Sequence, residues 1–277
     1  MLPAIAKPGN IMSKETVLVT GASSGIGLEL AKCFAADKPG LILVARNTAA
    51  LETLAAELRA KHQIEVHVIT ADLARPDAAQ SIFDELKGRG MTVDVLVNNA
   101  GFGLHGGFAE LPLGRQLEII QVNVMALVAL TGLFLPGMIQ RKRGGVLNVG
   151  SVAGFLPGPD MAVYCATKAF VQSFTEAIAE ELPGTGVTMT AFCPGATDTN
   201  FGKVARDQKQ RQRNIAKMPA DAAARRAHKD FRAGRIVSVP GFGNRLVIFL
   251  IRFMPRWLPR KLFKHYNRME EGLNRGK

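Results

Sequence analysis

The sequence predicts an α/β fold: a single doubly wound parallel sheet of about seven strands with helices on both faces. Three observations predict it. Short runs of Val, Ile and Leu recur along the chain, segments of helical length with an apolar stripe separate them, and a glycine-rich turn follows the first run. Strands that alternate with helices form parallel sheets with right-handed crossovers. A chain of 277 residues with 47% hydrophobic residues can bury the core that this fold requires.

Each strand is expected where a short aliphatic run meets a turn, because parallel strands are buried on both faces and show little polar alternation. The expected strands are 17–20, 41–45, 66–70, 95–98, 145–151, 187–192 and 236–239. Helices are expected between them, at 26–36, 48–61, from about 76, and at 112–138, 162–182 and 220–232. Pro112 opens the longest helix, since proline is tolerated at a helix N-terminus.

The first strand ends in GASSGIG, residues 21–27, and a helix follows directly. The glycines allow a tight turn and a close approach of the backbone to a ligand, and the helix N-terminus offers free N–H groups and a partial positive charge. This context is typical of a dinucleotide-phosphate site, although the spacing is G-x-x-x-G-x-G instead of G-x-G-x-x-G. A glycine-rich turn without a ligand is the alternative. The predicted binding residues are Gly21, Ser23, Ser24, Gly25, Ile26 and Gly27.

The ends of the next two strands predict how the rest of a dinucleotide is held. Arg46 follows the second strand, and Ala45 before it offers no carboxylate. A carboxylate here accepts from the ribose 2′-OH of NAD, whereas an arginine suits a 2′-phosphate, so the sequence favours NADP(H). Arg46 as a solvated loop residue is the alternative. Asp72 and Leu73 follow the third strand; Asp72 is placed to accept from an adenine amino group or to cap the helix that begins near Pro76.

Two segments rich in small or apolar residues contain asparagines. The fourth strand runs into NNAG, residues 98–101, a turn that leaves room for a flat ligand ring. Asn123 lies within the apolar helical segment QVNVMALVALTGLFLPGM. A polar side chain in such a segment needs a hydrogen-bonding partner or a water.

The stretch SVAGFLPGPDMAVYCATK, residues 151–168, carries the candidate catalytic chemistry. If it is helical from Met161, Tyr164 and Lys168 lie one turn apart on the same face. The ammonium would then stabilise the phenolate and lower the pKa of the tyrosine, and the Ser151 hydroxyl would bind the same substrate oxygen. This set suits reduction of a carbonyl or oxidation of an alcohol. The same spacing also occurs in helices with a half-buried tyrosine and a solvated lysine.

Taken together, these motifs resemble those of the short-chain dehydrogenase/reductase (SDR) family in its NADP-preferring type. The resemblance runs from about residue 17 to 199 and more weakly to 241. It implies a Rossmann-type fold for the sheet predicted above. The motifs stand in the family's order: TGASSGIG (20–27), NNAG (98–101), Asn123, Ser151, YCATK (164–168) and PGATDT (194–199). Their conjunction is far more specific than any one of them.

The resemblance implies an NADP(H)-dependent oxidoreductase. Tyr164 would be the general acid/base, Lys168 would lower its pKa and bind the nicotinamide ribose, Ser151 would position the substrate oxygen, and Asn123 would support a water relay to Lys168. Asp72 would contact adenine, and the nicotinamide carboxamide would meet Thr199. The other implied cofactor-binding residues are Leu73, Asn99, Ala100, Gly101, Pro194, Gly195 and Thr197. One departure is Ser24, where some NADP-preferring members carry a second basic residue, so the coenzyme prediction depends on Arg46.

Apolar residues surround the expected site and favour an apolar ketone, aldehyde or 3-oxoacyl substrate, although most pockets have such a lining. They are Phe102, Leu104, Phe155, Leu156, Met161 and Phe201. His105 is either a substrate contact or a polar loop residue. Residues 200–232 stand where the family places its variable substrate lid. A non-catalytic NADP-binding scaffold, or a peripheral membrane protein on the same fold, is the alternative function; the complete set Ser151, Tyr164 and Lys168 argues against the scaffold.

The net charge of +12 belongs to the C-terminal part, since residues 203–277 hold 20 Lys and Arg but five Asp and Glu. The expected organisation is a disordered extension at 1–14, a catalytic domain at 15–240 and an amphipathic basic extension at 241–277. Aromatic residues interleave with cations at 245–264, which suits a segment lying on an anionic membrane. Packing on the body or on a second subunit is the alternative. No nucleic-acid motif accompanies the charge, so no nucleic-acid partner is expected.

Three widely spaced cysteines, Cys33, Cys165 and Cys193, indicate a reducing compartment, and we expect a cytoplasmic protein. No spacing suggests a metal site. The first eleven residues lack the apolar core of a signal peptide. The apolar helices at 112–138 and 162–182 resemble those that form the dimer contact in SDR relatives, so a homodimer or homotetramer is expected.

Overall fold

The computed structural model describes residues 15–199, 217–255 and 257–261. The predictions made for residues 1–14, for Phe201 and the lid up to residue 216, and for residues 262–277 lie outside the described residues.

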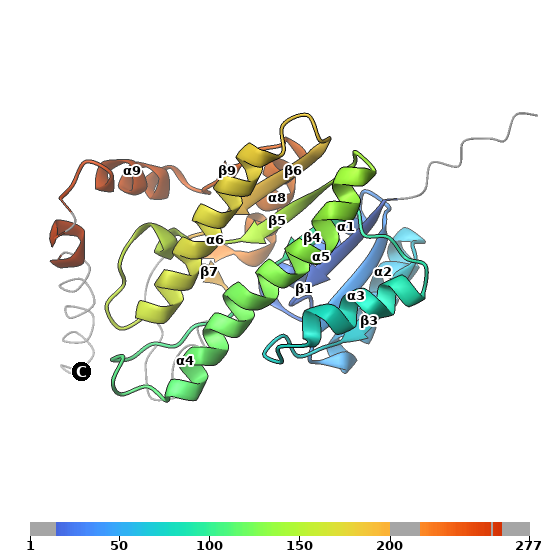
Figure 1. Cartoon of the computed structure of the whole chain (residues 1–277), viewed down its shortest axis with the longest axis horizontal. Coiled ribbons are helices and arrows are strands. Elements are labelled where there is room, and N and C mark those ends of the chain that lie inside the picture. The colour runs from blue at the N-terminus through green and yellow to red at the C-terminus, as the bar shows by residue number, and fades with distance from the viewer. Residues whose placement is uncertain (1–14, 200–216, 256, 262–277) are drawn as a thin grey trace, which may run out of the picture.

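A seven-stranded sheet forms the centre of the molecule, and every neighbouring pair of its strands is parallel (Figure 1). The order is β3-β2-β1-β4-β5-β6-β9. The strands are β1 (Thr16–Thr20), β2 (Gly40–Ala45), β3 (Val66–Thr70), β4 (Val95–Asn98), β5 (Gly144–Val149), β6 (Val187–Phe192) and β9 (Val237–Ser238). A separate parallel pair joins β7 (Thr197–Asp198) to β8 (Met218–Pro219). The strand order reverses at β1 and β4, and open α/β sheets bind ligands at the carboxyl ends of the strands there.

Helices cover both faces of the sheet, which confirms the predicted fold class. The helices of the chain include α1 (Gly25–Ala35), α2 (Thr48–His62), α3 (Ala78–Gly88), α4 (Leu113–Ile120), α5 (Ala126–Gln140), α6 (Ala162–Glu181), α8 (Ala220–Arg232) and α9 (Phe242–Ile251). A π-helical turn, η1 (Gln121–Met125), joins α4 to α5, and a 3₁₀ turn, η2 (Val152–Phe155), follows β5.

The two faces separate because successive strand residues point to opposite sides. Val17 and Val19 of β1 are buried in the cluster that includes residues of α1, α2 and α8. Leu18 between them is buried in the cluster that includes residues of α3 and α5. Figure 1 shows α3, α5 and α6 in front of the sheet. The carboxyl ends of the strands are therefore left for loops, which carry the candidate site.

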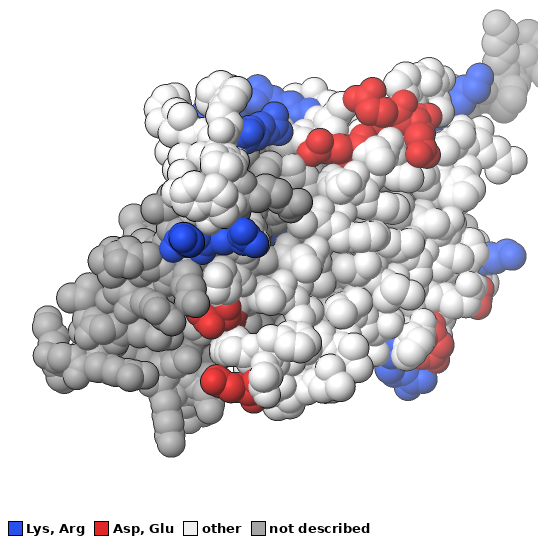
Figure 2. All heavy atoms as spheres, turned by 60° about the vertical axis from the view of Figure 1, so that its left-hand side comes forward, with Lys and Arg blue, Asp and Glu red and all other residues white. Residues whose placement is uncertain are grey.

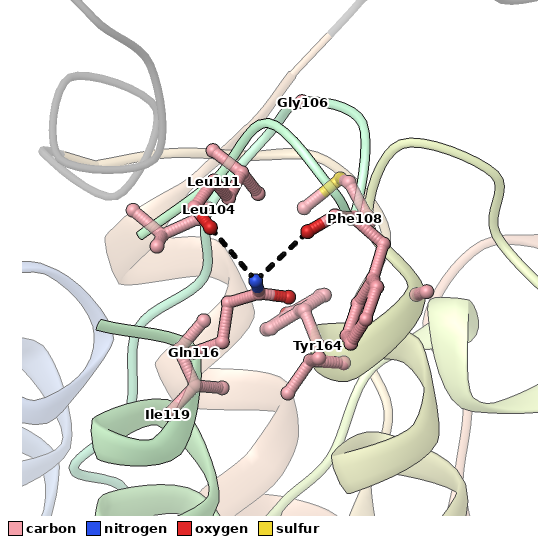
Figure 3. Close-up of a pocket in the computed structure, with 10 residues that line it drawn as sticks. Leu104, Gly106, Phe108, Leu111, Gln116, Ile119 and Tyr164 are labelled. Carbon is pink, nitrogen blue, oxygen red and sulfur yellow. Dashed lines mark hydrogen bonds between the residues drawn. The ribbon is translucent and has the colours of Figure 1, made fainter. Parts of the chain in front are cut away.

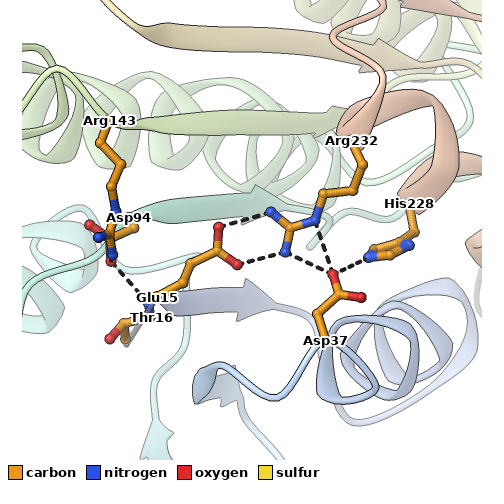
Figure 4. Close-up of polar contacts among 7 residues, drawn as sticks. All are labelled: Glu15, Thr16, Asp37, Asp94, Arg143, His228 and Arg232. Atoms are coloured by element: carbon orange, nitrogen blue, oxygen red, sulfur yellow. Dashed lines mark hydrogen bonds and ion pairs between the residues drawn. The ribbon is translucent and has the colours of Figure 1, made fainter. Parts of the chain in front are cut away.

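Charged residues fasten α8 to the opposite end of the sheet (Figure 4). Arg232 donates to both carboxylate oxygens of Glu15, at 2.8 and 2.6 Å, and to Asp37 at 3.0 Å. His228 lies 2.8 Å from the same Asp37 oxygen. Because α8 precedes β9 in the chain, this cluster fixes the helix that leads into the last strand.

The continuous helix Leu113–Gln140 is, among the described helices of at least 18 residues, long and apolar enough to cross a bilayer by length and composition. Core helices of globular proteins pass the same test. Here Leu127, Leu130 and Phe134 are buried in the protein core, while Leu117 and Met125 are exposed. The helix thus packs on the sheet with one face and leaves an apolar face uncovered.

Candidate active site

The turn between β1 and α1 leaves the N-terminus of α1 open. Gly25 has a φ of +57°, in the left-handed region, and a Cβ added to Gly27 would overlap Asn99 Nδ2 and Gly21 O. Ser24, the N-cap residue, makes no side-chain cap hydrogen bond, and the first turn of α1 holds no acidic residue. The backbone N–H groups and the positive end of the helix dipole are therefore free to bind an anion.

Thr20 links this turn to the NNAG turn that follows β4. Its Oγ1 donates to Val97 O at 3.1 Å and accepts from the backbone N–H groups of Asn99 and Ala100, at 3.0 and 3.1 Å. Asn99 Nδ2 donates in return to Thr20 O at 2.9 Å. These bonds set the width of the crevice between the two strands. The sequence assigned no role to Thr20; its only signal was a threonine at the end of a buried strand.

The residues predicted to hold the adenosine end lie along the same edge of the sheet. Arg46 is exposed after β2 and forms no ion pair with any described residue. Leu73 is buried beside the end of β3. The alternative role for Asp72 as a helix cap is wrong, because α3 begins later and has Asp77 as its N-cap residue. Asp72 Oδ1 instead accepts from Ala74 N at 3.1 Å, in the loop before that helix.

The loop after β6 closes over the glycine turn. Pro194 O accepts from Val152 N at 3.0 Å, and Thr197 Oγ1 donates to Gly195 O at 3.1 Å. A Cβ on Gly25 would lie 3.1 Å from Thr199 Cγ2. The structure thus brings Thr199 to the glycine turn, as a binding site shared by both loops requires.

Ser151, Tyr164 and Lys168 meet where β5 ends and α6 begins. Tyr164 and Lys168 are 9% and 5% exposed, and Lys168 Nζ lies 5.9 Å from the centre of the tyrosine ring. Lys168 Nζ also donates to Val149 O at 2.7 Å. Ser151 is hydrogen-bonded to the Tyr164 hydroxyl, and its Oγ accepts from Ala153 N at 3.1 Å. The three side chains are therefore gathered as predicted, with the lysine anchored to the strand.

Burial, and not the lysine charge, controls the protonation of this pair. Desolvation raises the pKa of Tyr164 to about 12, against a smaller lowering by its hydrogen bond with Ser151. Desolvation also lowers the pKa of Lys168 to about 8, partly offset by Cys193. Lys168 is not among the groups that shift the tyrosine, so the expected lowering of the tyrosine pKa is not found. At neutral pH the phenol keeps its proton and the amine is largely charged.

Comparison with known proteins agrees with this geometry. The sequence profile of the short chain dehydrogenase family matches residues 15–210. The chain belongs to the short-chain dehydrogenase family. A very-long-chain 3-oxoacyl-CoA reductase of Phaeosphaeria nodorum is 39% identical over 191 residues, which cover 68% of this chain and 56% of that protein. The chain spans 56% to 66% of the length of three curated relatives that it matches.

Two solved short-chain dehydrogenases share the fold. One from Sphingobium yanoikuyae, in complex with NADPH, has 32% identity and a TM-score of 0.76, covering 87% of this chain and 97% of its own. One from Burkholderia phymatum, in complex with NAD, has 26% identity and a TM-score of 0.76, and the match covers 86% of this chain and 92% of its own. Nicotinamide dinucleotides of both kinds thus occur among structures similar to this chain.

The residues of this short-chain dehydrogenase fit a nicotinamide dinucleotide. The glycine turn packs so closely on its neighbours that a side chain does not fit at Gly27, which lets the backbone approach a ligand, and the α1 N-terminus offers N–H donors there. A Cβ on Gly101 would lie 3.0 Å from Asn123 Oδ1 and 3.5 Å from Lys168 Nζ, so the NNAG turn also passes close to Lys168. Among the described residues, no group of His, Cys, Asp and Glu has the arrangement of a metal site.

Asn123 ties the NNAG turn to α6. It is 1% exposed, its Nδ2 donates to Phe102 O at 3.0 Å and to Thr167 Oγ1 at 3.1 Å, and its Oδ1 accepts from Phe102 N at 3.1 Å. It lies in the π-helical turn η1, a distortion that often marks functional sites. The side chain therefore finds protein partners, and Thr167 is a partner that the sequence pattern did not single out.

An apolar hollow opens beside Tyr164 (Figure 3). Its lining includes the expected residues Leu104 and Met161, and also Phe108, Leu111 and Ile119. Gln116 Nε2 holds the loop above it by donating to Phe108 O at 3.0 Å and Leu111 O at 3.1 Å. Phe102, Leu156 and His105 do not line this hollow, and Phe155 lines a second one.

Cys193 contacts Ser151, a role that the sequence pattern did not single out. It is fully buried after β6 and accepts a hydrogen bond from the backbone of Ser151. Burial raises the pKa of its thiol to about 12, against a lowering by Lys168. It therefore supports the backbone of Ser151 as a neutral thiol. Spacing could not reveal this contact, because it joins the ends of two strands.

Proposed function

We propose that this protein is an NADPH-dependent oxidoreductase that interconverts carbonyl compounds and alcohols. The observation that carries the proposal is the set of Ser151 with the buried Tyr164 and Lys168, placed beside an open helix N-terminus at the carboxyl edge of the sheet. When bound, NADPH supplies a hydride to the carbonyl carbon. The protein holds and orients the reactants and moves the proton.

Tyr164 delivers that proton. Because burial raises its pKa to about 12, it is a phenol at neutral pH and can donate to the substrate oxygen as negative charge develops there. Ser151, hydrogen-bonded to the same hydroxyl, donates to the same oxygen once substrate enters. The Lys168 ammonium, held by Val149 O and 5.9 Å from the centre of the tyrosine ring, would bind the nicotinamide ribose. Asn123 keeps the NNAG turn and α6 in register, and we propose that it supports a water relay that reaches Lys168.

The glycine turn, with Ser23, Ser24 and Ile26, would hold the pyrophosphate. Arg46 supports NADP(H), because it is exposed at the end of β2 and no acid stands beside it. The Sphingobium relative with NADPH favours the same choice, and the Burkholderia relative with NAD the other. Arg46→Asp should raise the KM for NADPH far more than that for NADH. Equal changes for both coenzymes, or the same change in the exposed control Lys87→Asp, would refute the assignment.

The proposed substrate class rests on the mainly aliphatic and aromatic side chains around the hollow beside Tyr164, which has a volume of about 10 Å³ and must widen to admit a substrate. We propose an apolar ketone, aldehyde or 3-oxoacyl compound, in keeping with the name of the Phaeosphaeria relative. The test is a panel of ketones, aldehydes and 3-oxoacyl esters, with NADPH consumption followed by absorbance. Tyr164→Phe should lower turnover by about 10² to 10⁴-fold while NADPH still raises the melting temperature. Turnover near wild type in that variant would overturn the mechanism; NADPH binding without turnover on any substrate would favour a non-catalytic scaffold.

We also propose a homodimer or homotetramer formed through α4, α5 and α6. Exposed apolar side chains mark this face, including Leu117 and Met125, and Phe170 stacks on Phe174 with ring centres 5.7 Å apart. Light scattering should therefore give at least twice the chain mass, and Leu117→Asp should lower it. A cytoplasmic location is proposed with it, since Cys33, Cys165 and Cys193 are free thiols. Cell fractionation tests that location.

A further inference from the structure

The C-terminal segment, defined here as residues 242–261, exposes large apolar side chains along its whole length. No residue of α9 is buried. Phe242, Val247, Phe249, Phe253 and Trp257 are between 51% and 74% exposed. Single exposed apolar residues are ordinary, but a contiguous set marks an interaction surface. We therefore expect this surface to bind a partner.

The charge of the same segment identifies the chemistry of that partner. Residues 242–261 include five Lys and Arg and no Asp or Glu. The side chains of Arg245, Arg252, Arg260 and Lys261 are exposed, and none forms an ion pair with a described carboxylate. Lys261 Nζ lies 5.5 Å from the Trp257 ring. In the upper left of Figure 2, uncharged side chains project with Lys and Arg atoms beside and below them.

This surface does not suit contact with the same surface of a second copy of the protein, because an isologous contact would place the cations of the two copies against one another. The chain's own segments 200–216 and 262–277 do not suit it either, since each carries more Lys and Arg than Asp and Glu. The apolar helix α9 has ten residues, too few for the roughly 20 that span a bilayer. Apolar side chains flanked by cations on a short helix are what an anionic lipid surface binds.

The segment is attached next to the catalytic loop. Asn244 Nδ2 donates to Pro240 O at 2.9 Å and lies close to Gly195, whose added Cβ would be 2.8 Å from it. Below α9, a cavity of about 330 Å³ is enclosed by Phe155 and Pro157 on one side and by Ile251, Met254, Pro259 and Arg260 on the other. Phe155 belongs to η2, the turn that begins directly after Ser151.

We propose that the C-terminal segment docks this protein on the surface of an anionic bilayer. The apolar side chains enter the boundary between headgroups and acyl chains, and the arginines bind the anionic headgroups. The cavity below α9 then faces the membrane, next to the turn that carries the catalytic serine. This inference does not depend on the proposed function, because lipid binding is measured without coenzyme or substrate.

Trp257 makes the test direct, because it is the one tryptophan of the chain. The full-length protein is mixed with vesicles of phosphatidylcholine alone or of phosphatidylcholine with phosphatidylserine. The expected result is a blue shift of its fluorescence and quenching by brominated acyl chains in the anionic vesicles, both weaker at 1 M salt, where the Debye length is about 3 Å. Binding without a tryptophan shift would place the contact elsewhere and overturn the proposal, as would no binding at low salt.

Matched variants locate the contact by co-sedimentation. Phe253→Asp should weaken binding by at least about tenfold, because a large apolar group is lost from the boundary. Ile236→Asp, at a residue 37% exposed outside this segment and outside α4, α5 and α6, is the control and should bind as wild type. Arg245→Gln with Arg252→Gln should weaken binding by about 20- to 30-fold, at roughly fivefold for each charge. Equal effects of Phe253→Asp and Ile236→Asp, or dissociation of an oligomer by Phe253→Asp, would show a protein contact and overturn the proposal.

Discussion

Replacement of Lys168 by methionine should change the pH dependence of the free energy of unfolding and should abolish carbonyl reduction. Burial lowers the pKa of the Lys168 ammonium from its ordinary 10.5 to about 8. Between these two pKa values, Lys168 binds more protons in the unfolded chain than in the native protein. This group therefore makes the wild-type free energy of unfolding increase as the pH rises. The gain between pH 7 and pH 9.5 is about 2 kcal/mol. Methionine fills a similar space and has no proton to bind, so Lys168→Met lacks the gain.

Loss of the hydrogen bond to Val149 O costs the variant about 1–3 kcal/mol, but this cost is the same at both pH values. The difference in free energy of unfolding between wild type and Lys168→Met therefore depends on pH through the lysine. Contributions from the titrating cysteines and from Tyr164 are common to both proteins and cancel in that difference. Urea unfolding at pH 7 and at pH 9.5 measures it, with Lys87→Met, an exposed lysine on α3, as the control. Carbonyl reduction should be lost in Lys168→Met. Parallel stability changes in wild type and Lys168→Met would refute the claim that burial lowers the pKa of Lys168.

Two further substitutions test the crevice that the dinucleotide is proposed to occupy. Thr20→Val leaves the N–H groups of Asn99 and Ala100 without their acceptor and should lower the free energy of unfolding by about 1–3 kcal/mol in urea titrations; an unchanged midpoint would contradict this role. Gly27→Ala introduces a Cβ against Asn99 Nδ2 and should abolish the rise in melting temperature that NADPH gives, whereas Gly88→Ala, where a Cβ meets nothing within 4 Å, should keep it. Equal behaviour of the two alanine variants would count against the crevice as the binding site.

Much of the fold was predictable because its strands are buried on both faces. Runs such as Leu41–Ala45 have no polar alternation, and Gly21 and Arg46 directly follow the first two runs. The structure confirms those strands to within about a residue or two. Asp72 shows the limit: two aspartates precede α3, and the sequence could not tell which of them stands at the N-cap, since both Asp72 and Asp77 are good cap residues.

The sequence predicted which residues lie together at the site, but not the pKa values of their side chains. The spacing of Tyr164 and Lys168 follows from helix geometry alone, and α6 bears it out. The direction of the tyrosine pKa does not follow from spacing, because burial depends on everything packed around the ring. The polar chain that runs from Asn98 to Asn148 and on to Thr175, with bonds of 3.0 and 2.9 Å, was invisible for the same reason. Its members are 50 and 27 residues apart and meet only when β4, β5 and α6 are assembled.

One contact between a strand and a helix sets the geometry of Ser151, Tyr164 and Lys168. Val149 O, the last carbonyl of β5, holds the Lys168 ammonium at 2.7 Å, and Ser151, two residues further along, is hydrogen-bonded to Tyr164. Both bonds join the same strand end to the same face of α6, so the serine, phenol and amine move as a unit. The Cys193 thiol accepts from the backbone of Ser151 and adds β6 to that unit. Apart from Tyr164, no residue that lines the hollow takes part in these bonds, so substitutions elsewhere in its lining can change what the hollow admits and leave the bonds in place.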